Sequence, residues 1–276
     1  QCNELLKQNP YLQTSMDDYF IPKMRYTFTY QGSAKKHRSP VRWETTIEES
    51  GNVTALYDVL VQGNRWNQKD KTLFKNPYSQ YVKIETDLTK TWPINSKSQV
   101  VGHINAGWVW SYGNSTDAPF SERFYIGGAN SIRAFTVRSI GPGAYPSMGG
   151  VGNKQMSYLL QNGDSKLVMN LEYRRQLVGS LYGAIFLDAG NIWSNSDYTL
   201  NYGDLDADDH DFVEKWNQDV SDMKFKPGKL LKHLATGTGV GLRYDMDFLV
   251  IRVDWGFGLH LPYDTGKSCY FNIPRF

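Results

Sequence analysis

An arginine within an apolar loop is the residue whose type and surroundings most clearly predict a defined interaction. Arg133 lies in a segment from Arg123 to Phe135 that is rich in apolar and small residues and contains the paired glycines Gly127 and Gly128. A loop of this composition is expected to fold back onto another part of the protein. A buried guanidinium needs acidic partners, because an unpaired buried charge costs several kcal/mol.

Two carboxylates later in the chain are candidate partners for this arginine. Glu172 and Asp188 fall on the polar faces of two successive predicted strands. A guanidinium presents its N–H donors as a planar fork and can bind two carboxylates at once. We therefore predict that Arg133, flanked by Ile132 and Phe135, anchors the loop on those strands. This arrangement would hold the loop in place and would carry out no reaction.

The elements that must position these residues are β-strands. Apolar and polar residues alternate with a period of two in eight segments, which predicts strands with one apolar and one polar face. The predicted strands cover residues 24–31, 41–48, 82–89, 100–111, 167–174, 181–188, 239–244 and 249–259.

The composition narrows the class of protein. The chain has 276 residues, a mean hydropathy of −0.51 and 14% aromatic residues. No run approaches the roughly 18 uncharged apolar residues of a membrane-spanning helix, which excludes a protein that crosses a membrane with several helices. The aromatic content excludes a disordered chain, and a net charge of +2 gives no electrostatic reason to expect nucleic acid. A transmembrane β-barrel combines a polar average with many aromatic residues, because lipid-facing and lumen-facing residues alternate.

The connections between the predicted strands are asymmetric. Long segments at 51–80, 113–165 and 194–233 contrast with short turns, which is typical of outer-membrane barrels. The strands of a soluble β-sandwich or lectin-like domain also alternate apolar and polar residues. Such a domain rarely combines three long loops with charged strand faces, however. Short helices are predicted at 53–61 and 211–220. Aromatic residues near strand ends suit interfacial girdles: Tyr30, Trp43, Trp92, Trp110, Tyr112 and Trp193.

Four motifs follow one another along the second half of the chain: the loop tip Ser131–Phe135, then Asn170–Arg174, then Phe186–Trp193, and finally the glycine-rich stretch Gly237–Arg243 with Arg252-Val-Asp254. In type and order they resemble the motifs of the BamA/TamA superfamily of outer-membrane assembly and translocation barrels. The resemblance implies a loop that enters the barrel lumen and places its Ile-Arg tip against the wall. The long loop insertions look closer to Bacteroidetes TamA-like members than to proteobacterial BamA.

The sequence also departs from the family. Ala134 stands where the family tip usually has glycine, so a positive φ is not expected there. The family barrel has about sixteen strands and is preceded by POTRA domains, whereas this chain shows eight clear strands and no POTRA-like pattern. We therefore interpret residues 1–276 as the C-terminal part of a larger all-β, antiparallel transmembrane β-barrel, with eight or nine of its strands. A complete small barrel is the alternative. Residues 268–276 resemble the family's short last strand, with Pro274 tolerated at an edge.

Glycines and charged residues of the last two predicted strands are expected to contact the loop on the barrel wall. Glycines leave the backbone bare and so permit close packing of the loop. A phosphate site is not expected there, because no helix follows to supply its N-terminus. The five histidines lack metal-ligand spacing, and no Ser-His-Asp set lies in a nucleophile-elbow context, so no metal, cofactor or catalytic group is predicted. Cys2 and Cys269 could pair or remain free. The residues predicted to form this docking wall are Gly237, Gly239, Gly241, Arg243, Arg252 and Asp254.

The resemblance implies a function in the Gram-negative outer membrane. A non-enzymatic barrel with a weak strand seam would insert or translocate client outer-membrane proteins. Its other expected partners are the lipid bilayer around it and accessory subunits or periplasmic domains of the same protein. The alternatives are a two-partner polypeptide secretion pore, a passive porin-like or structural barrel and, last, a soluble carbohydrate-binding β protein.

Overall fold

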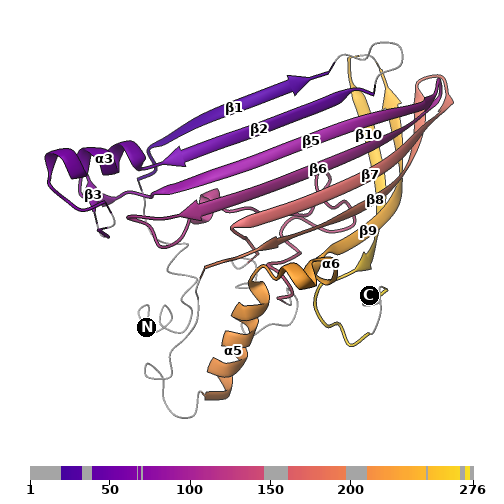
Figure 1. The fold of residues 1–276 in the computed structure, drawn as a ribbon. Helices are drawn as coiled ribbons and strands as arrows, with labels where there is room; N and C mark the ends of the chain where they lie inside the picture. Colours follow the sequence, from indigo (N-terminus) through magenta and orange to yellow (C-terminus); the bar gives the residue numbers. More distant parts are fainter. Residues whose placement is uncertain are drawn as a thin grey trace.

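In the described part of the chain, eight long antiparallel strands form one continuous sheet. The computed structural model describes residues 20–32, 39–66, 68–69, 71–145, 161–196, 210–246, 248–267 and 271–273. Each strand pairs with its neighbours in sequence, which gives an up-and-down meander (Figure 1). All eight strands predicted from the alternation are confirmed. In sheet order they are β1 (Lys23–Gln31), β2 (Val41–Ser50), β5 (Tyr81–Asn95), β6 (Ser98–Ser111), β7 (Ser165–Val178), β8 (Leu181–Trp193), β9 (Ala235–Asp245) and β10 (Val250–His260).

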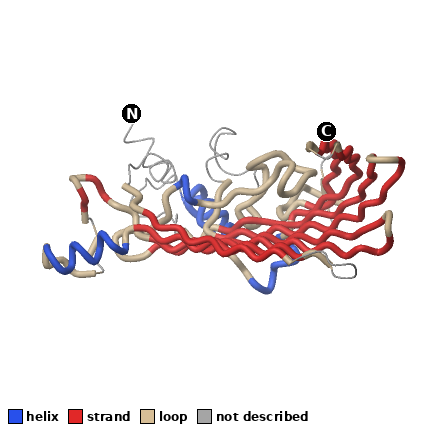
Figure 2. Tube along the Cα trace, turned by 90° about the horizontal axis from the view of Figure 1, so that it is seen from above, coloured by secondary structure: helices blue, strands red, loops and turns tan. Residues whose placement is uncertain are grey.

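The sheet is curved and open. Figure 2 shows the strands bending around a concave side on which most of the loops lie. β1 and β10 are the two outer strands, and within the described residues neither pairs with the other. The structure is therefore a partial β-barrel, in agreement with the predicted fold class.

The two faces of the sheet differ in chemistry. Convex-facing side chains are mostly apolar and exposed, as expected for a wall that contacts lipid. Concave-facing side chains are mostly polar or charged, because successive side chains point to opposite faces. The exposed apolar side chains of the convex face include Tyr26, Ile84, Trp108, Leu171, Ile185, Val240 and Val253.

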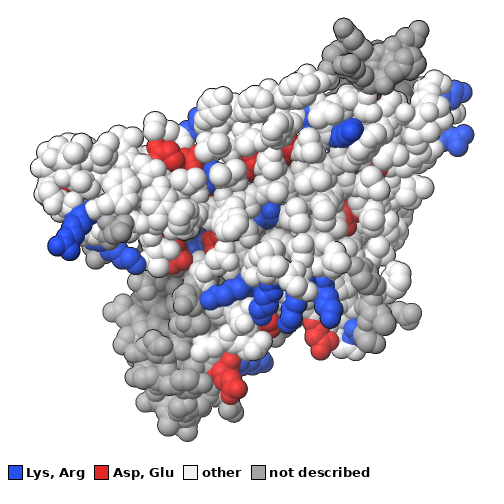
Figure 3. All heavy atoms as spheres, viewed as in Figure 1, with Lys and Arg blue, Asp and Glu red and all other residues white. Residues whose placement is uncertain are grey.

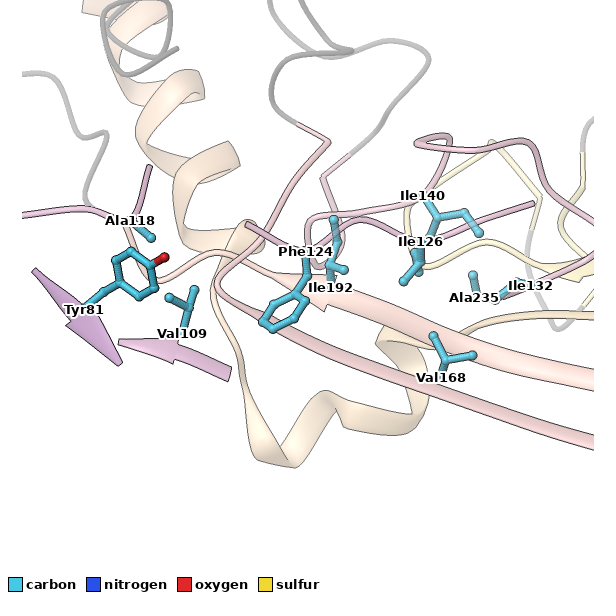
Figure 4. Packing of buried hydrophobic residues seen from close by; sticks show 10 residues of the cluster. All are labelled: Tyr81, Val109, Ala118, Phe124, Ile126, Ile132, Ile140, Val168, Ile192 and Ala235. Atoms are coloured by element: carbon cyan, nitrogen blue, oxygen red, sulfur yellow. The ribbon is translucent and has the colours of Figure 1, made fainter. Parts of the chain in front are cut away.

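The buried core lies on the concave side, between the wall and the segment that joins β6 to β7. We call residues 112–164 the inserted loop. Its Phe124, Ile126, Ile132 and Ile140 are almost fully buried and face wall residues (Figure 4). Burial of each such side chain contributes about 1.5–3 kcal/mol. The wall and loop residues that complete this cluster are Tyr81, Val109, Ala118, Val168, Ile192 and Ala235.

The other connections also follow the asymmetric pattern. The predicted helices are confirmed as α3 (Asn52–Val61) and α5 (His210–Met223). None of the helices in the described part of the chain is both long and apolar enough to cross a membrane. The remaining small elements are β3 (Thr72–Leu73), β4 (Asn76–Pro77), η1 (Phe120–Glu122), η4 (Pro227–Lys229) and α6 (Leu230–His233).

Two predictions differ from the structure. Trp193 is not part of an exposed girdle: it is 2% exposed and packs edge-on against Phe225, with ring centroids 5.1 Å apart. Residues 271–273 do not form a strand. The Asn272 side chain instead pairs with the backbone N–H and C=O of Leu261, at 2.8 and 2.9 Å, and so takes the place of a strand partner. Cys2, Cys269 and the rest of the predicted last strand lie outside the described residues.

Candidate functional site

The register of β7 and β8 places the two predicted carboxylates close together on the concave face. Glu172 of β7 lies opposite Phe186 of β8, and Asn170 lies opposite Asp188. Glu172 and Asp188 are therefore two residues apart in register and point to the same side. Both are buried, with Glu172 5% and Asp188 0% exposed.

Arg133 of the inserted loop binds both carboxylates. Its Nε and Nη2 donate to Asp188 at 2.9 and 2.8 Å, and its Nη1 donates to Glu172. The backbone N–H of Arg133 also donates to Asp188 at 2.9 Å, so one carboxylate fixes both main chain and side chain. The guanidinium Cζ lies 3.5 Å from the ring centroid of Phe186. Because the Arg133 side chain is only 7% exposed, its charge depends on these partners rather than on water.

Further charges extend this group along the wall. Arg243 Nη2 donates to both oxygens of Glu172 at 3.1 Å, and its Nη1 donates to Asp254 at 2.6 Å. Arg174 Nε donates to Glu172 at 2.6 Å. Each of the three buried or nearly buried carboxylates thus contacts at least one guanidinium group. This pairing is what makes the burial of these charges tolerable. We call Arg133, Arg174, Arg243, Glu172, Asp188 and Asp254 the ionic cluster.

Glycines of β9 and β10 provide bare backbone for the tip of the loop. A Cβ added at Gly237 would lie 2.4 Å from the Cβ of Ala134, and one at Gly256 would lie 2.9 Å from the Ala134 Cα. A Cβ at Gly258 would lie 3.1 Å from the Phe135 ring. Side chains on these strands would therefore push the tip away from the wall.

The other predicted glycines have different neighbours. Gly239 faces Phe186, and Gly241 faces the Arg243 and Asp254 side chains, so both make room for the ionic cluster rather than for the loop itself. Gly127 and Gly128 lie in the inserted loop with φ of 100° and 87°, a region that favours glycine. Ala134 is not among the non-glycine residues with positive φ, as expected.

Arg252 lies at the edge of the ionic cluster and joins it to the loop. Its Nη2 donates to the backbone oxygen of Ala129 at 2.7 Å and to the side chain of Asn130 at 3.0 Å. Its Nε lies 3.2 Å from Asp254. The structure therefore brings all the predicted wall charges to the tip of the loop.

A second ionic contact, which the sequence did not predict, fixes the beginning of the inserted loop. Glu122 accepts hydrogen bonds from Lys23 of β1 at 2.9 Å and from Lys83 of β5 at 3.4 Å. Nearby, a Cβ added at Gly107 of β6 would lie 2.6 Å from the ring of Phe124. The loop thus contacts β1 and β5 at Glu122 and β7 and β8 at Arg133.

A chain of polar side chains joins the site to the middle of the sheet. Asn170 Nδ2 donates to Asp188 at 2.8 Å and to the backbone oxygen of Ser131 at 2.7 Å. Its other side-chain atom, Oδ1, pairs with one nitrogen of His103, and the other nitrogen pairs with Asp87, both at 2.7 Å. This chain fixes the orientation of Asn170 and therefore supports the loop tip.

Comparison of the chain with known proteins identifies its family. The Omp85 superfamily domain matches residues 62–274. The chain belongs to the Omp85 superfamily. It is a partial outer-membrane β-barrel of the BamA/TamA kind, located in the outer membrane of a Gram-negative bacterium, as predicted. Members of this family are transport and assembly factors rather than enzymes.

This chain spans only part of the length of the relatives that it matches. The outer membrane protein assembly factor BamA of Neisseria meningitidis serogroup B is 26% identical over 127 residues, which cover 44% of this chain and 15% of that protein. The crystal structure of Haemophilus ducreyi BamA lacking POTRA domains 1–3 has a TM-score of 0.44 at 15% identity. CdiB from Acinetobacter baumannii has a TM-score of 0.33 at 14% identity. Each of these two matches covers 87% of this chain, but only 51% and 39% of the other chain.

Several contact residues of this Omp85 chain were absent from the sequence prediction. Gly256 and Gly258 alternate with aromatic residues in the last predicted strand, and this pattern could have identified them as a bare stripe. Glu122 carries no comparable signal, because it stands among polar residues and its neighbours in sequence do not mark it as buried. The role of Asn170 follows only from the register between β6, β7 and β8.

Proposed function

We propose that this chain is the wall-and-loop part of an outer-membrane protein insertion or translocation factor. The observation that carries the proposal is the inserted loop, which is anchored by Arg133 to two carboxylates on adjacent strands within a chain of the Omp85 superfamily. The activity of the whole protein is a proposal, because this chain spans only part of the length of its relatives.

The loop acts in this proposal as an internal brace. Glu122 contacts β1 and β5, whereas Arg133 contacts β7 and β8. The two contacts lie on different parts of the open sheet, so the loop restrains the distance between β1 and the pair β7–β8. Such a brace would keep the wall curved while an edge strand exchanges partners.

Client recognition would take place at a strand edge. At the weak seam between the first and last strands of the full barrel, backbone N–H and C=O groups would bind an extended segment of a client chain. Client outer-membrane proteins are the proposed partners, with accessory subunits or periplasmic domains of the same protein assisting. The ionic cluster has no catalytic part in this proposal, because its charges are paired with one another.

Depletion of the full-length protein in its native host tests the proposal. The expected result is a reduced level of many outer-membrane β-barrel proteins, measured by quantitative proteomics of isolated outer membranes. Loss of one secreted polypeptide alone, together with large open-pore conductance in planar bilayers, would instead identify a two-partner secretion pore. Unchanged levels of all outer-membrane and secreted proteins would contradict a role in assembly or translocation.

A further inference from the structure

A short basic segment lies on the convex side of the barrel wall, apart from the inserted loop. Residues 224–232 join α5 to β9 and include η4 and α6. Figure 2 shows that α5 lies on the concave side, whereas the short helix after it projects from the convex side. The chain thus crosses the rim of the sheet and emerges where the wall faces lipid. We call residues 224–232 the rim segment.

Both ends of the rim segment are fixed to the wall. The backbone N–H of Ser194 donates to the oxygen of Met223 at 3.1 Å, and Phe225 packs on the buried Trp193. At the other end, the Asn191 side chain donates to the backbone oxygen of His233. The segment between these contacts is therefore held at one height on the barrel.

The rim segment carries four lysines and no acidic residue. Lys226 pairs with Asp222 of α5 at 3.1 Å. Lys229 and Lys232 are exposed, and neither makes an ion pair within the described residues. Figure 3 shows a row of basic side chains over this part of the molecule, below a wall that is mostly uncharged. The pKa of His233 is lowered by burial and by the nearby Lys226 and Lys229, which reflects the positive field.

Apolar side chains accompany the lysines. Leu231 is 72% exposed and Phe225 is 43% exposed. Lysine and leucine on one short surface segment are the combination that suits a membrane interface, where the charge remains in the headgroup region and the apolar group enters the acyl region. The neighbouring strand β9 continues this surface with the exposed Val240 and Leu242.

The position of the rim segment along the strands indicates which side of the membrane it faces. It lies at the end of the strands that carries the long connections, opposite the short turns between β5 and β6 and between β7 and β8. In outer-membrane barrels, long loops are extracellular and short turns are periplasmic. This orientation puts the lysines at the extracellular ends of the strands, on the side of the outer leaflet.

We propose that the rim segment binds the phosphate group of an anionic lipid in the outer leaflet, through Lys229 and Lys232 with Leu231 inserted below them. The inference depends on the outer-membrane location of the chain and not on its proposed assembly function. Free inorganic phosphate would bind weakly, because it lacks the acyl chains that Leu231 and the convex wall contact.

Lipid A, which carries two phosphates, is a suitable probe. Binding of fluorescent lipid A to the detergent-solubilised full-length protein is measured by anisotropy for wild type, K229E/K232E and K229R/K232R. The matched control is K97E/K215E, which makes the same change of charge at two exposed lysines outside the rim segment. Each lysine near an anionic surface contributes about 1 kcal/mol, so K229E/K232E should weaken binding by about tenfold or more.

The expected pattern is weaker binding for K229E/K232E alone, with K229R/K232R and the control close to wild type. Heat-resistant gel mobility of every variant establishes that the barrel is folded. Wild-type affinity in K229E/K232E would overturn the proposal, as would an equal loss in K97E/K215E. Full competition by millimolar inorganic phosphate would also overturn it, because the site would then recognise a free anion rather than a lipid.

Discussion

Arg133 joins the inserted loop to two strands through a single side chain. Its guanidinium and backbone N–H together make four hydrogen bonds to Asp188 and Glu172. A buried ion pair is not by itself strongly stabilising relative to a well-packed apolar core, because both charges have lost their hydration. Removal of one partner is costly, however, since the remaining charges stay buried. The contribution of Arg133 should therefore appear most clearly when it is deleted.

The variant Arg133→Ala is expected to lose about 3–5 kcal/mol of folding free energy, because Asp188 and Glu172 would remain buried without their main cation. The measurement is the temperature at which the detergent-solubilised full-length protein loses heat-resistant gel mobility. Arg42→Ala is the control, because Arg42 pairs with Glu44 at 2.9 Å on an exposed surface and should contribute less than about 1 kcal/mol. Equal transition temperatures for Arg133→Ala and wild type would argue against the anchor.

The strands β9 and β10 form a glycine stripe that admits the loop tip. The contact between Ala134 and Gly237 is the closest of these, since an added Cβ would lie 2.4 Å from the Ala134 Cβ. Neither the wall nor the tip has room for a further methyl group at this point. The two positions should therefore depend on each other.

Gly237→Ala is expected to destabilise the barrel by about 1–3 kcal/mol through overpacking. Ala134→Gly in the same chain should recover part of that loss, because it removes the opposing methyl group. Gly228→Ala is the control, since no atom lies within 4 Å of an added Cβ there. Thermal transitions of the single and double variants give the coupling. If Ala134→Gly gave no recovery, the tip would not rest on Gly237.

Elements and contacts could be predicted where the sequence itself carries a pattern or a physical cost that requires them. The eight strands were predictable because a two-residue period depends only on adjacent residues. The contact of Arg133 with Glu172 and Asp188 followed from the burial cost of a lone cation and from the shared face of two successive strands. Glu122 was not predictable, because it stands beside Arg123 in a polar part of the loop, where nothing in the sequence marks its side chain as buried. Residues 271–273 were assigned wrongly because the Asn272 side chain replaces the strand hydrogen bonds.

At the scale of the whole molecule, the open sheet presents two edges. β1 and β10 each lack a partner on one side within the described residues. Hydrocarbon cannot satisfy backbone N–H and C=O groups, so a lipid-exposed edge costs several kcal/mol for each unpaired group. This cost supports the interpretation of the chain as part of a larger barrel, in which further strands would pair with these edges.

In the full-length protein, the outward-facing amides of β1 are therefore expected to exchange slowly with solvent deuterium, at rates close to those of β5 in the middle of the sheet. Hydrogen exchange with mass spectrometry in lipid nanodiscs gives the comparison. The turn between β5 and β6 is the internal control for fast exchange. Fast exchange along β1 would contradict the larger barrel, whereas protection would agree with it.

The central claim is that Arg133 and Asp188 interact directly and thereby hold the inserted loop on the wall. The most direct test is a double-mutant cycle with Arg133→Met, Asp188→Asn and the combined variant, using unfolding free energies of the full-length protein in detergent. We predict a coupling free energy of at least about 2 kcal/mol, at the upper end for contacting residues. A coupling near zero, with additive losses in the combined variant, would show that the two side chains stabilise the barrel independently and would contradict the anchor.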